Sequence, residues 1–222
     1  AHVAADGNIV SELAQKLSEA ERDFKVLRQV WSHNCLFRNF KFQVYISCIV
    51  QKLLYGLESA WINAAGRRKM DGFHARCIRR ILGVSPAFIS RVSNAYVLKQ
   101  LAAFPLSTIL LERQLSYFGL IASMNPSSSL RRILFQDDKQ FTLREPALKR
   151  GRPRDTWGRK ILQEAIRMTG SIEALRTQVH EPSWKMKVKK YCRQQFGYQS
   201  SKINGDAVDS RSTSCPIVPQ FV

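Results

Sequence analysis

Apolar residues recur at three- and four-residue steps over most of the chain, a spacing typical of amphipathic helices. The first run predicts one long helix from about Asp6 to Trp31. A second helix is predicted from about Asn39 to Tyr55, ending at Gly56. Further helices are predicted over residues 93–103, 106–124, 155–168, 171–180 and 182–196. Because no long segment alternates at period two, we expect an all-α fold, an irregular bundle of about seven or eight helices.

The most clearly amphipathic helix is predicted over residues 67–82, and Gly83 and Pro86 are expected to end it. One side of this helix is apolar and includes His74, which we interpret as a core histidine. The opposite side is basic and carries Arg68, Lys69, Arg76, Arg79 and Arg80. Asp71 is the single acidic residue of the segment. The basic side is either a solvated helix face or a surface that contacts phosphates.

The positive charge of the chain is concentrated in one block. The net charge is +18, and residues 67–196 carry 26 Lys and Arg against 9 Asp and Glu. Residues 1–66 carry a net charge of only +1, and residues 197–222 are neutral. Such a distribution favours a polyanionic partner, with nucleic acid first and an anionic membrane surface second.

A second basic feature is the ribbon at residues 149–154, Lys-Arg-Gly-Arg-Pro-Arg. Gly151 permits close approach of the backbone, and Pro153 favours an extended conformation at the residue before it. The ribbon is either a solvated linker or a segment that enters a nucleic-acid minor groove. The candidate nucleic-acid contacts of the ribbon are Lys149, Arg150, Arg152 and Arg154. Arg159, in the predicted helix that follows, is a further candidate.

The segment that follows the ribbon is predicted to be helical. Asp155 is the expected N-cap of this helix, and Trp157 is interpreted as a core anchor rather than a stacking residue.

Catalytic and metal-binding patterns are absent from the sequence. The five cysteines, Cys35, Cys48, Cys77, Cys192 and Cys215, are widely spaced and form no CxxC pair, so we expect reduced thiols and neither disulfides nor a zinc site. Residues 135–138, Phe-Gln-Asp-Asp, resemble the metal-binding motif of polymerases. No strand-like segment elsewhere supplies a further carboxylate, so we interpret Asp137 and Asp138 as loop residues.

No signal peptide or membrane span is evident in the sequence. We therefore expect an intracellular protein, nuclear or cytoplasmic, that is not secreted.

Four segments taken together resemble one family. They are Leu-Leu-Tyr-Gly-Leu-Glu at residues 53–58 with Trp61 behind it, residues 73–83 (Phe-His-Ala-Arg-Cys-Ile-Arg-Arg-Ile-Leu-Gly), residues 111–124, and Arg-Gly-Arg-Pro-Arg at residues 150–154 followed by Trp157. Their order and approximate spacing are similar to those of the region after the polymerase palm in non-LTR (LINE-type) retrotransposon reverse transcriptases. The resemblance covers roughly residues 6–165.

The resemblance implies that the chain is the thumb and post-thumb region of such an enzyme and lacks the catalytic palm. The implied partners are RNA, DNA and the missing palm domain. No catalytic residue is expected in this chain, no cofactor is expected, and Mg²⁺ is expected only at the absent palm. Because the sequence begins with Ala1, we also expect it to be a piece of a longer product.

The expected organisation has five segments. These are a thumb-like helical hairpin (1–62), an amphipathic basic helical region (63–135), a basic loop (136–154), C-terminal helices (155–196) and a disordered tail (197–222). A different class of function is also open, namely a stand-alone basic helical protein that docks on an acidic protein or an anionic membrane.

Overall fold

The computed structural model describes residues 9–137, 141–144 and 156–194. The expected all-α fold is confirmed, while the predicted disordered tail lies outside the described residues. The N-terminal elements are α1 (Ile9–Val26), α2 (Arg28–Ser32), α3 (Arg38–Tyr45), the π-helical turn η1 (Ile46–Val50), α4 (Gln51–Leu54), α5 (Ala64–Leu82), α6 (Ala87–Ser90) and α7 (Asn94–Gln100). The remaining elements are α8 (Leu106–Ser123), α9 (Ser129–Leu134), β1 (Phe135–Asp137), β2 (Thr142–Leu143), α10 (Trp157–Thr169), α11 (Ile172–Gln178) and α12 (Trp184–Gln194).

The predicted helix from Asp6 to Trp31 is interrupted, which corrects the expectation of one rod. The α-helical part of the segment ends at Val26, and α2 begins at Arg28. The Trp31 indole stacks on Phe24 with ring centroids 4.8 Å apart, and its Nε1 donates a hydrogen bond of 2.8 Å to the Phe24 carbonyl. Because a side chain satisfies this carbonyl, the chain can turn here without leaving a buried acceptor unpaired.

The first lobe of the molecule packs α1, the continuous rod α3–η1–α4 and α5 around shared apolar side chains, which we call the N-terminal core cluster. Tyr45, Ile49 and Leu54 of the rod are fully buried in it, beside Met70 and Phe73 of α5. The cluster therefore crosses the expected boundary at residues 62 and 63. Gly83 ends α5 with a φ of 71°, as its position in the sequence predicts.

The second lobe packs α10, α11 and α12 against the C-terminal half of α8, around a C-terminal core cluster that includes Phe118, Ile161 and Val188. It also contains the antiparallel hairpin β1–β2, where the sequence predicted only a loop. Two buried aromatic residues explain the hairpin, because the rings of Phe135 and Phe141 lie 5.0 Å apart.

The start of α10 also differs from the prediction. Thr156 is its N-cap, and the Thr156 side chain accepts a hydrogen bond from the Arg159 amide. Asp155, the predicted cap, lies outside the described residues. Trp157 packs against the C-terminal core cluster with its ring centroid 5.8 Å from that of Tyr117, which confirms the core interpretation.

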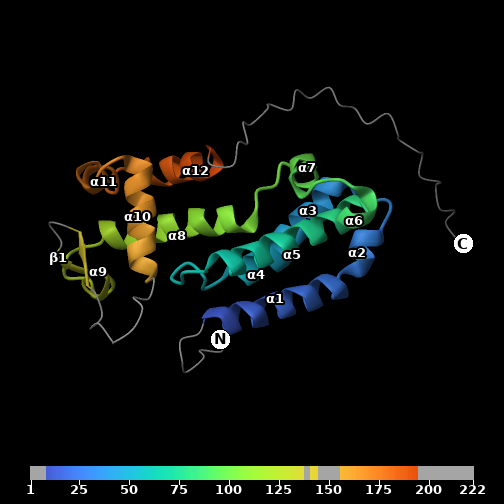
Figure 1. Cartoon of the computed structure of the whole chain (residues 1–222), viewed down its shortest axis with the longest axis horizontal. Coiled ribbons are helices and arrows are strands. Elements are labelled where there is room, and N and C mark those ends of the chain that lie inside the picture. Colours follow the sequence, from blue (N-terminus) through green and yellow to red (C-terminus); the bar gives the residue numbers. More distant parts are fainter. Residues whose placement is uncertain (1–8, 138–140, 145–155, 195–222) are drawn as a thin grey trace, which may run out of the picture.

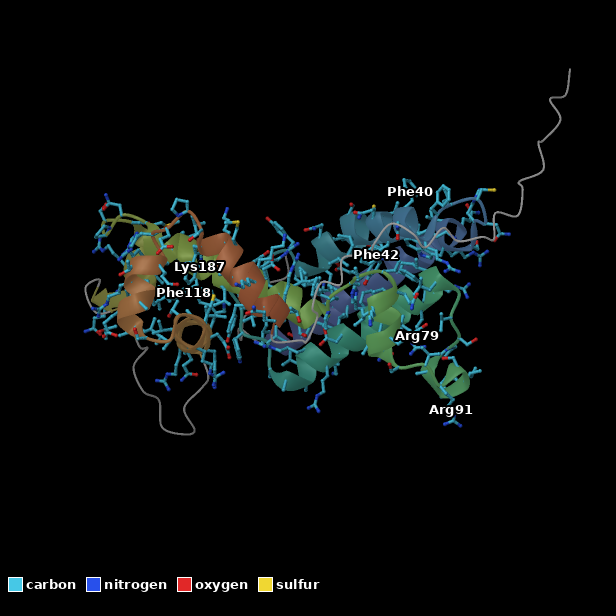
Figure 2. The ribbon with its side chains drawn as sticks, turned by 90° about the horizontal axis from the view of Figure 1, so that it is seen from above. Phe40, Phe42, Arg79, Arg91, Phe118 and Lys187 are labelled. Carbon is cyan, nitrogen blue, oxygen red and sulfur yellow. The ribbon has the colours of Figure 1, made fainter. Side chains whose placement is uncertain are left out.

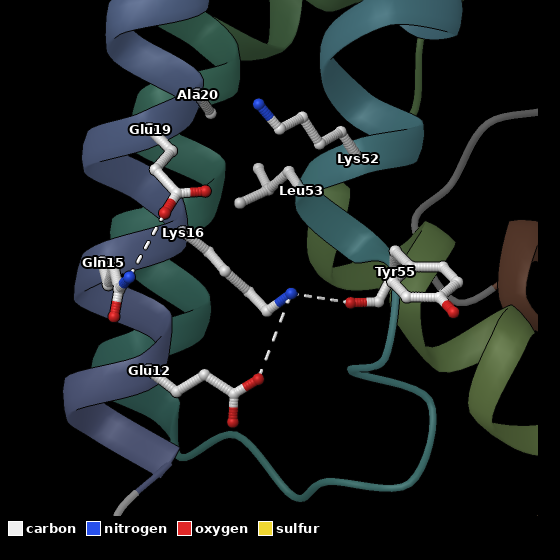
Figure 3. Close-up of a pocket in the computed structure, with 8 residues that line it drawn as sticks. All are labelled: Glu12, Gln15, Lys16, Glu19, Ala20, Lys52, Leu53 and Tyr55. Atoms are coloured by element: carbon white, nitrogen blue, oxygen red, sulfur yellow. Dashed lines mark hydrogen bonds and ion pairs between the residues drawn. The ribbon is translucent and has the colours of Figure 1, made fainter. Parts of the chain in front are cut away.

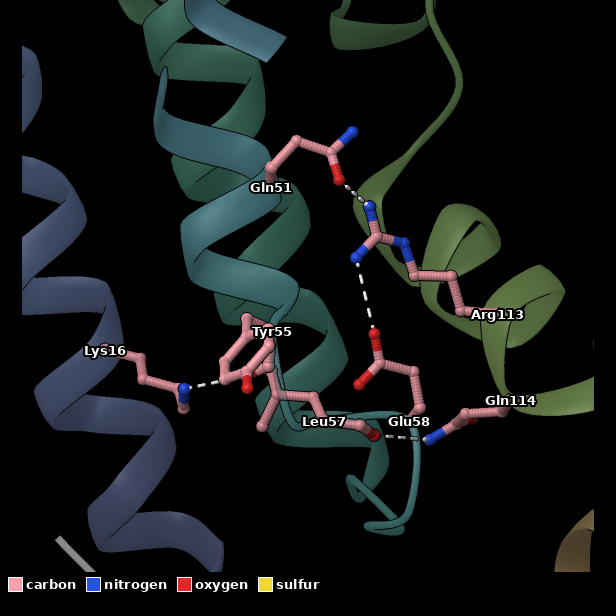
Figure 4. A network of polar contacts seen from close by, with 7 residues as sticks. All are labelled: Lys16, Gln51, Tyr55, Leu57, Glu58, Arg113 and Gln114. Atoms are coloured by element: carbon pink, nitrogen blue, oxygen red, sulfur yellow. Dashed lines mark hydrogen bonds and ion pairs between the residues drawn. The ribbon is translucent and has the colours of Figure 1, made fainter. Parts of the chain in front are cut away.

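Helix α8 joins the two lobes and runs along the long axis of the molecule (Figure 1). Leu106 and Leu110 in its first half belong to the N-terminal core cluster, whereas Leu115 and Phe118 in its second half belong to the C-terminal one. Polar contacts secure the junction, as Figure 4 shows. Arg113 donates to Gln51 and to Glu58, and the buried Gln114 donates to the Leu57 carbonyl at 3.3 Å.

Candidate nucleic-acid interface

The basic side of α5 is the part of the predicted site that the structure describes best. Arg68, Lys69, Arg76 and Arg80 are exposed on this helix, as expected. Asp71 does not neutralise them, because its carboxylate turns to the start of α8. There Oδ1 and Oδ2 accept hydrogen bonds from the amide and hydroxyl of Ser107 at 2.9 and 2.7 Å. A carboxylate at a helix N-terminus is electrostatically favourable, so this acid serves the fold and leaves the face cationic.

Arg79 is a correction to the predicted exposed face, since only 5% of the residue is accessible to solvent. Its guanidinium donates to Asn94 Oδ1 at 3.0 Å, to the Ser85 carbonyl at 3.1 Å and to the Ser90 hydroxyl at 3.3 Å, and it also reaches the Val92 carbonyl. The helical wheel placed Arg79 on the basic side, but the α5–α7 connection folds back over that position. Arg79 therefore holds this connection in place and is removed from the candidate contacts.

A large groove, which we call the basic groove, lies between the C-terminal half of α5, the start of α3 and the α5–α6 connection. It encloses about 1100 Å³. Its lining includes five cationic residues and no Asp or Glu among the described residues. The cations are Arg38, Lys41, Arg76, Arg79 and Arg80. A concave surface lined with one sign of charge focuses the electric field and attracts counter-ions.

The cations of the groove differ in how available they are to a ligand. The side chains of Arg38 and Arg80 are exposed and make no ion pair with a described residue. Arg76 is also exposed, but its Nη2 lies 2.7 Å from Glu21 Oε1. Solvent-exposed pairs of this kind are weak, and a phosphate can compete for the guanidinium. Lys41 is buried and donates to the Trp31 carbonyl at 2.9 Å, so it supports the wall of the groove.

Sequence reasoning missed the other side of the groove. Arg38 lies in a segment of nearly neutral charge, and nothing in the sequence places it beside a helix that begins 26 residues later, at Ala64. Phe88 also lines the groove, although 76% of it is exposed. The one signal in the sequence is the run Phe-Arg-Asn-Phe-Lys at residues 37–41, in which aromatic and basic residues alternate.

The remaining predicted contacts do not meet at this groove. Arg68 and Lys69 are exposed on the N-terminal half of α5, outside the groove lining. Arg159 lies in α10 of the second lobe and is half-buried. Lys149, Arg150, Arg152 and Arg154 of the basic ribbon lie outside the described residues. The structure thus brings Arg76 and Arg80 together with Arg38, and does not join them to the other candidates.

A second hollow, between α1 and α4, has a different character (Figure 3). Glu12, Glu19, Lys16 and Lys52 all line it, so the two signs of charge are balanced. Lys16 Nζ donates to the Tyr55 carbonyl at 2.8 Å and lies 4.0 Å from Glu12 Oε1. The local carboxylates oppose binding of an anion, so we assign it no role in nucleic-acid contact.

The buried polar groups of the first lobe form a small cluster on α5 and the α3–η1–α4 rod. Tyr45 Oη and His74 Nδ1 share a hydrogen bond of 2.9 Å, which confirms His74 as a core residue. Burial lowers the pKa of His74 to about 4, and burial raises the pKa of Cys77 to about 12. At neutral pH both groups are therefore uncharged, which suits a structural role in the core.

The residues that the structure describes contain neither a candidate metal cluster nor a candidate membrane span. No group of three or more His, Cys, Asp or Glu side chains converges in a way that could hold a metal ion. Within the same ranges, no helix is long and apolar enough to cross a membrane.

Comparisons of the chain with protein-family models, with curated proteins and with solved structures find no match. A functional assignment therefore depends on the residues themselves and on their geometry.

Proposed function

We propose that this chain binds nucleic acid through its phosphates, as the thumb and post-thumb part of a non-LTR retrotransposon reverse transcriptase. The observation that carries the proposal is the basic groove, in which cations from α3 and α5 face the same space and no described Asp or Glu belongs to the lining. Backbone phosphates are the polyanions that such an arrangement suits, because Lys and Arg gain affinity by displacing condensed counter-ions.

The sequence resemblance points to the same surface. Residues 73–83 form the closest-matching segment, and they include Arg76 and Arg80 on the α5 wall of the groove. In this proposal the carboxylates that hold Mg²⁺ belong to a palm domain that the chain does not contain. The chain alone should then extend no primer, and any Mg²⁺-dependent synthesis by it would contradict this part of the proposal.

One observation favours a second class of partner. Phe88 and Ile89 are exposed on α6 beside the basic groove, and an apolar side chain next to cations is also typical of a surface that docks on anionic lipid. Vesicles that contain phosphatidylserine therefore belong in the same experiment. Binding to these vesicles together with no binding to RNA or DNA would replace the nucleic-acid proposal with this alternative.

Binding should be measured by fluorescence anisotropy with labelled RNA, DNA and RNA–DNA hybrid over a range of KCl concentrations. The test variant is Arg38→Gln with Arg80→Gln, which removes two exposed cations of the groove. Each lost phosphate contact should weaken binding of every sequence and flatten the slope of log K against log salt by about one unit. We expect a slope flatter by about one to two units in the double variant.

The matched control is Arg22→Gln with Arg132→Gln. Both arginines are exposed, lie outside the groove lining and carry the same total charge as the test pair. If the two double variants lose equal affinity and slope, net charge rather than the groove determines binding. If neither variant changes the slope, the groove makes no phosphate contact and the proposal fails.

A further inference from the structure

Phe88 combines an aromatic face, high exposure and a position on the lining of the basic groove. On this basis we infer that α6 is a stacking platform, and that the occupant of the groove is a single strand with an unpaired base lying on the Phe88 ring. The inference rests on the proposed function and narrows it to unpaired RNA or DNA, whose exposed base faces an aromatic ring can contact.

The α6 turn that carries Phe88 is held in place by polar contacts, two of them from the buried Arg79. Arg79 donates to the Ser85 carbonyl before α6 and to the Ser90 hydroxyl at its end. Ser90 Oγ in turn donates to the carbonyls of Ser85 and Pro86 at 3.1 and 3.2 Å. Arg91 ends the turn with a φ of 57° and projects beyond Arg79 at this end of the molecule (Figure 2). Because the backbone of this turn is fixed before binding, little backbone entropy is lost when a base stacks on the ring that it carries.

The chemistry of the groove distinguishes a single strand from a duplex. In a duplex the base faces are covered by neighbouring bases, and a protein meets only base edges and phosphates. A single strand presents phosphates and base faces together. In the groove, Arg38 and Arg80 can contact the phosphates, and Phe88 can stack on a base face. Along an undistorted duplex, an exposed phenylalanine ring finds no uncovered base face on which to stack.

Another exposed phenylalanine provides a matched control. Phe37 is 84% exposed and immediately precedes Arg38, but it does not line the groove. Substitution of either phenylalanine removes an accessible ring and leaves the core untouched. The comparison of Phe88→Ala with Phe37→Ala therefore separates stacking in the groove from a general loss of exposed apolar surface.

The experiment measures affinities of the full chain for three probes, namely a single strand, the same strand with abasic sites, and the corresponding duplex. Loss of one base–aromatic stack should weaken binding of the intact single strand by about five- to a hundredfold in Phe88→Ala, with an unchanged salt slope. The duplex and the abasic strand should bind wild type and Phe88→Ala alike. Phe88→Trp should keep the affinity, and its fluorescence should be quenched by the intact strand.

Each other outcome overturns a defined part of the argument. If Arg38→Gln with Arg80→Gln weakens binding but Phe88→Ala does not, the groove binds phosphates and the stacking inference is wrong. Equal losses in Phe37→Ala and Phe88→Ala, or equal losses on single strand and duplex, also overturn the inference. If nucleic acid does not bind at all while Phe88→Ala reduces binding to anionic vesicles, both the inference and the proposed function are replaced by a membrane contact.

Discussion

Arg79 and Arg80 are adjacent in the sequence, yet their surroundings are opposite. Arg80 is exposed at the basic groove, whereas Arg79 is enclosed by the connection from α5 to α7 and hydrogen-bonded to residues of that connection. A helical wheel separates apolar from polar sides, but it cannot show which polar residue a later segment covers. The same type of side chain therefore stabilises the fold at one position and remains available to a ligand at the next.

Arg79→Gln should lower the free energy of unfolding by about 2–4 kcal/mol, because several part-buried acceptors lose one shared, buried donor at once. Arg80→Gln should change it by no more than about 0.5 kcal/mol, as is usual for an exposed position. Urea denaturation of both variants measures the difference. Equal stabilities would show that the Arg79 hydrogen bonds contribute little to the fold.

His74 should make stability depend on pH. Its pKa is about 4 in the folded protein because of burial, and about 6.5 in the unfolded chain. The unfolded state therefore binds the proton more readily. The contribution of neutral His74 to the free energy of unfolding is fully present above the unfolded pKa and is lost as the pH falls toward 4. This residue alone should lower the free energy of unfolding by about 2–3 kcal/mol between about pH 7.5 and pH 4.5.

The check on this prediction compares urea denaturation of wild type and His74→Gln across that pH range. The carboxylates that titrate in the same range are common to both proteins, so the difference between the two pH profiles reports His74. The variant should be less stable at neutral pH but have the flatter profile. Parallel profiles would mean that His74 is protonated equally easily in both states.

At the scale of elements, α8 is distinguished by burial on most of its sides. Its own buried residues extend from Leu106 to Ala122, because its first half packs in the N-terminal core cluster and its second half in the C-terminal one. At Gly119 the helix packs against α12 so tightly that a side chain there would overlap the buried Trp184 indole. The Trp184 Nε1 atom donates to the Leu115 carbonyl at 3.3 Å, which fixes the ring across the helix.

Gly119→Ala should therefore destabilise the protein by about 1–3 kcal/mol, the usual cost of overpacking a closed interface. Gly72→Ala is the matched control, since the nearest atom to a methyl group there is Arg76 Nη1 at 3.8 Å. Removal of a glycine from an open helix position should raise stability by up to about 1 kcal/mol. Denaturation followed by tryptophan fluorescence tests both changes, and a neutral Gly119→Ala would contradict the packing.

At the scale of the whole molecule, one helix belongs to both lobes (Figure 1). Each lobe also contains a buried thiol, Cys77 in the first and Cys192 in the second, and burial raises the pKa of each to about 12. Thiol reactivity can therefore report the opening of each lobe separately.

We expect Cys77 and Cys192 to become reactive over the same range of urea, because loss of α8 removes part of both core clusters. The measurement is thiol labelling read by mass spectrometry, in a protein in which Cys35, Cys48 and Cys215 are replaced by Ser. Labelling of Cys192 at clearly lower urea than Cys77 would show that the lobes unfold independently.

The sequence by itself determined the helical class, the approximate extents of α5, α8 and α12, and the C-terminal end of α5 at Gly83. These features depend on local periodicity and backbone preference, which neighbouring residues carry. The sequence also located the cationic block. It could not predict the break at Leu27, where the Trp31 ring stacks on Phe24 and Phe24 also meets Tyr45 of α3. It could not predict the hairpin at Phe135 either, because that ring packs against Phe118 of α8.

The tertiary structure alone decided which cations share a site. It turned Asp71 toward α8, enclosed Arg79, and placed Arg38 and Phe88 in the lining of the same basic groove as Arg80. The physical reason is that charge accumulates at a site through packing between distant segments, while periodicity reports only one helix at a time. The amphipathic pattern thus identified the helix that carries the groove, and the residues that α3 and α6 add to its lining determined the chemistry of the groove.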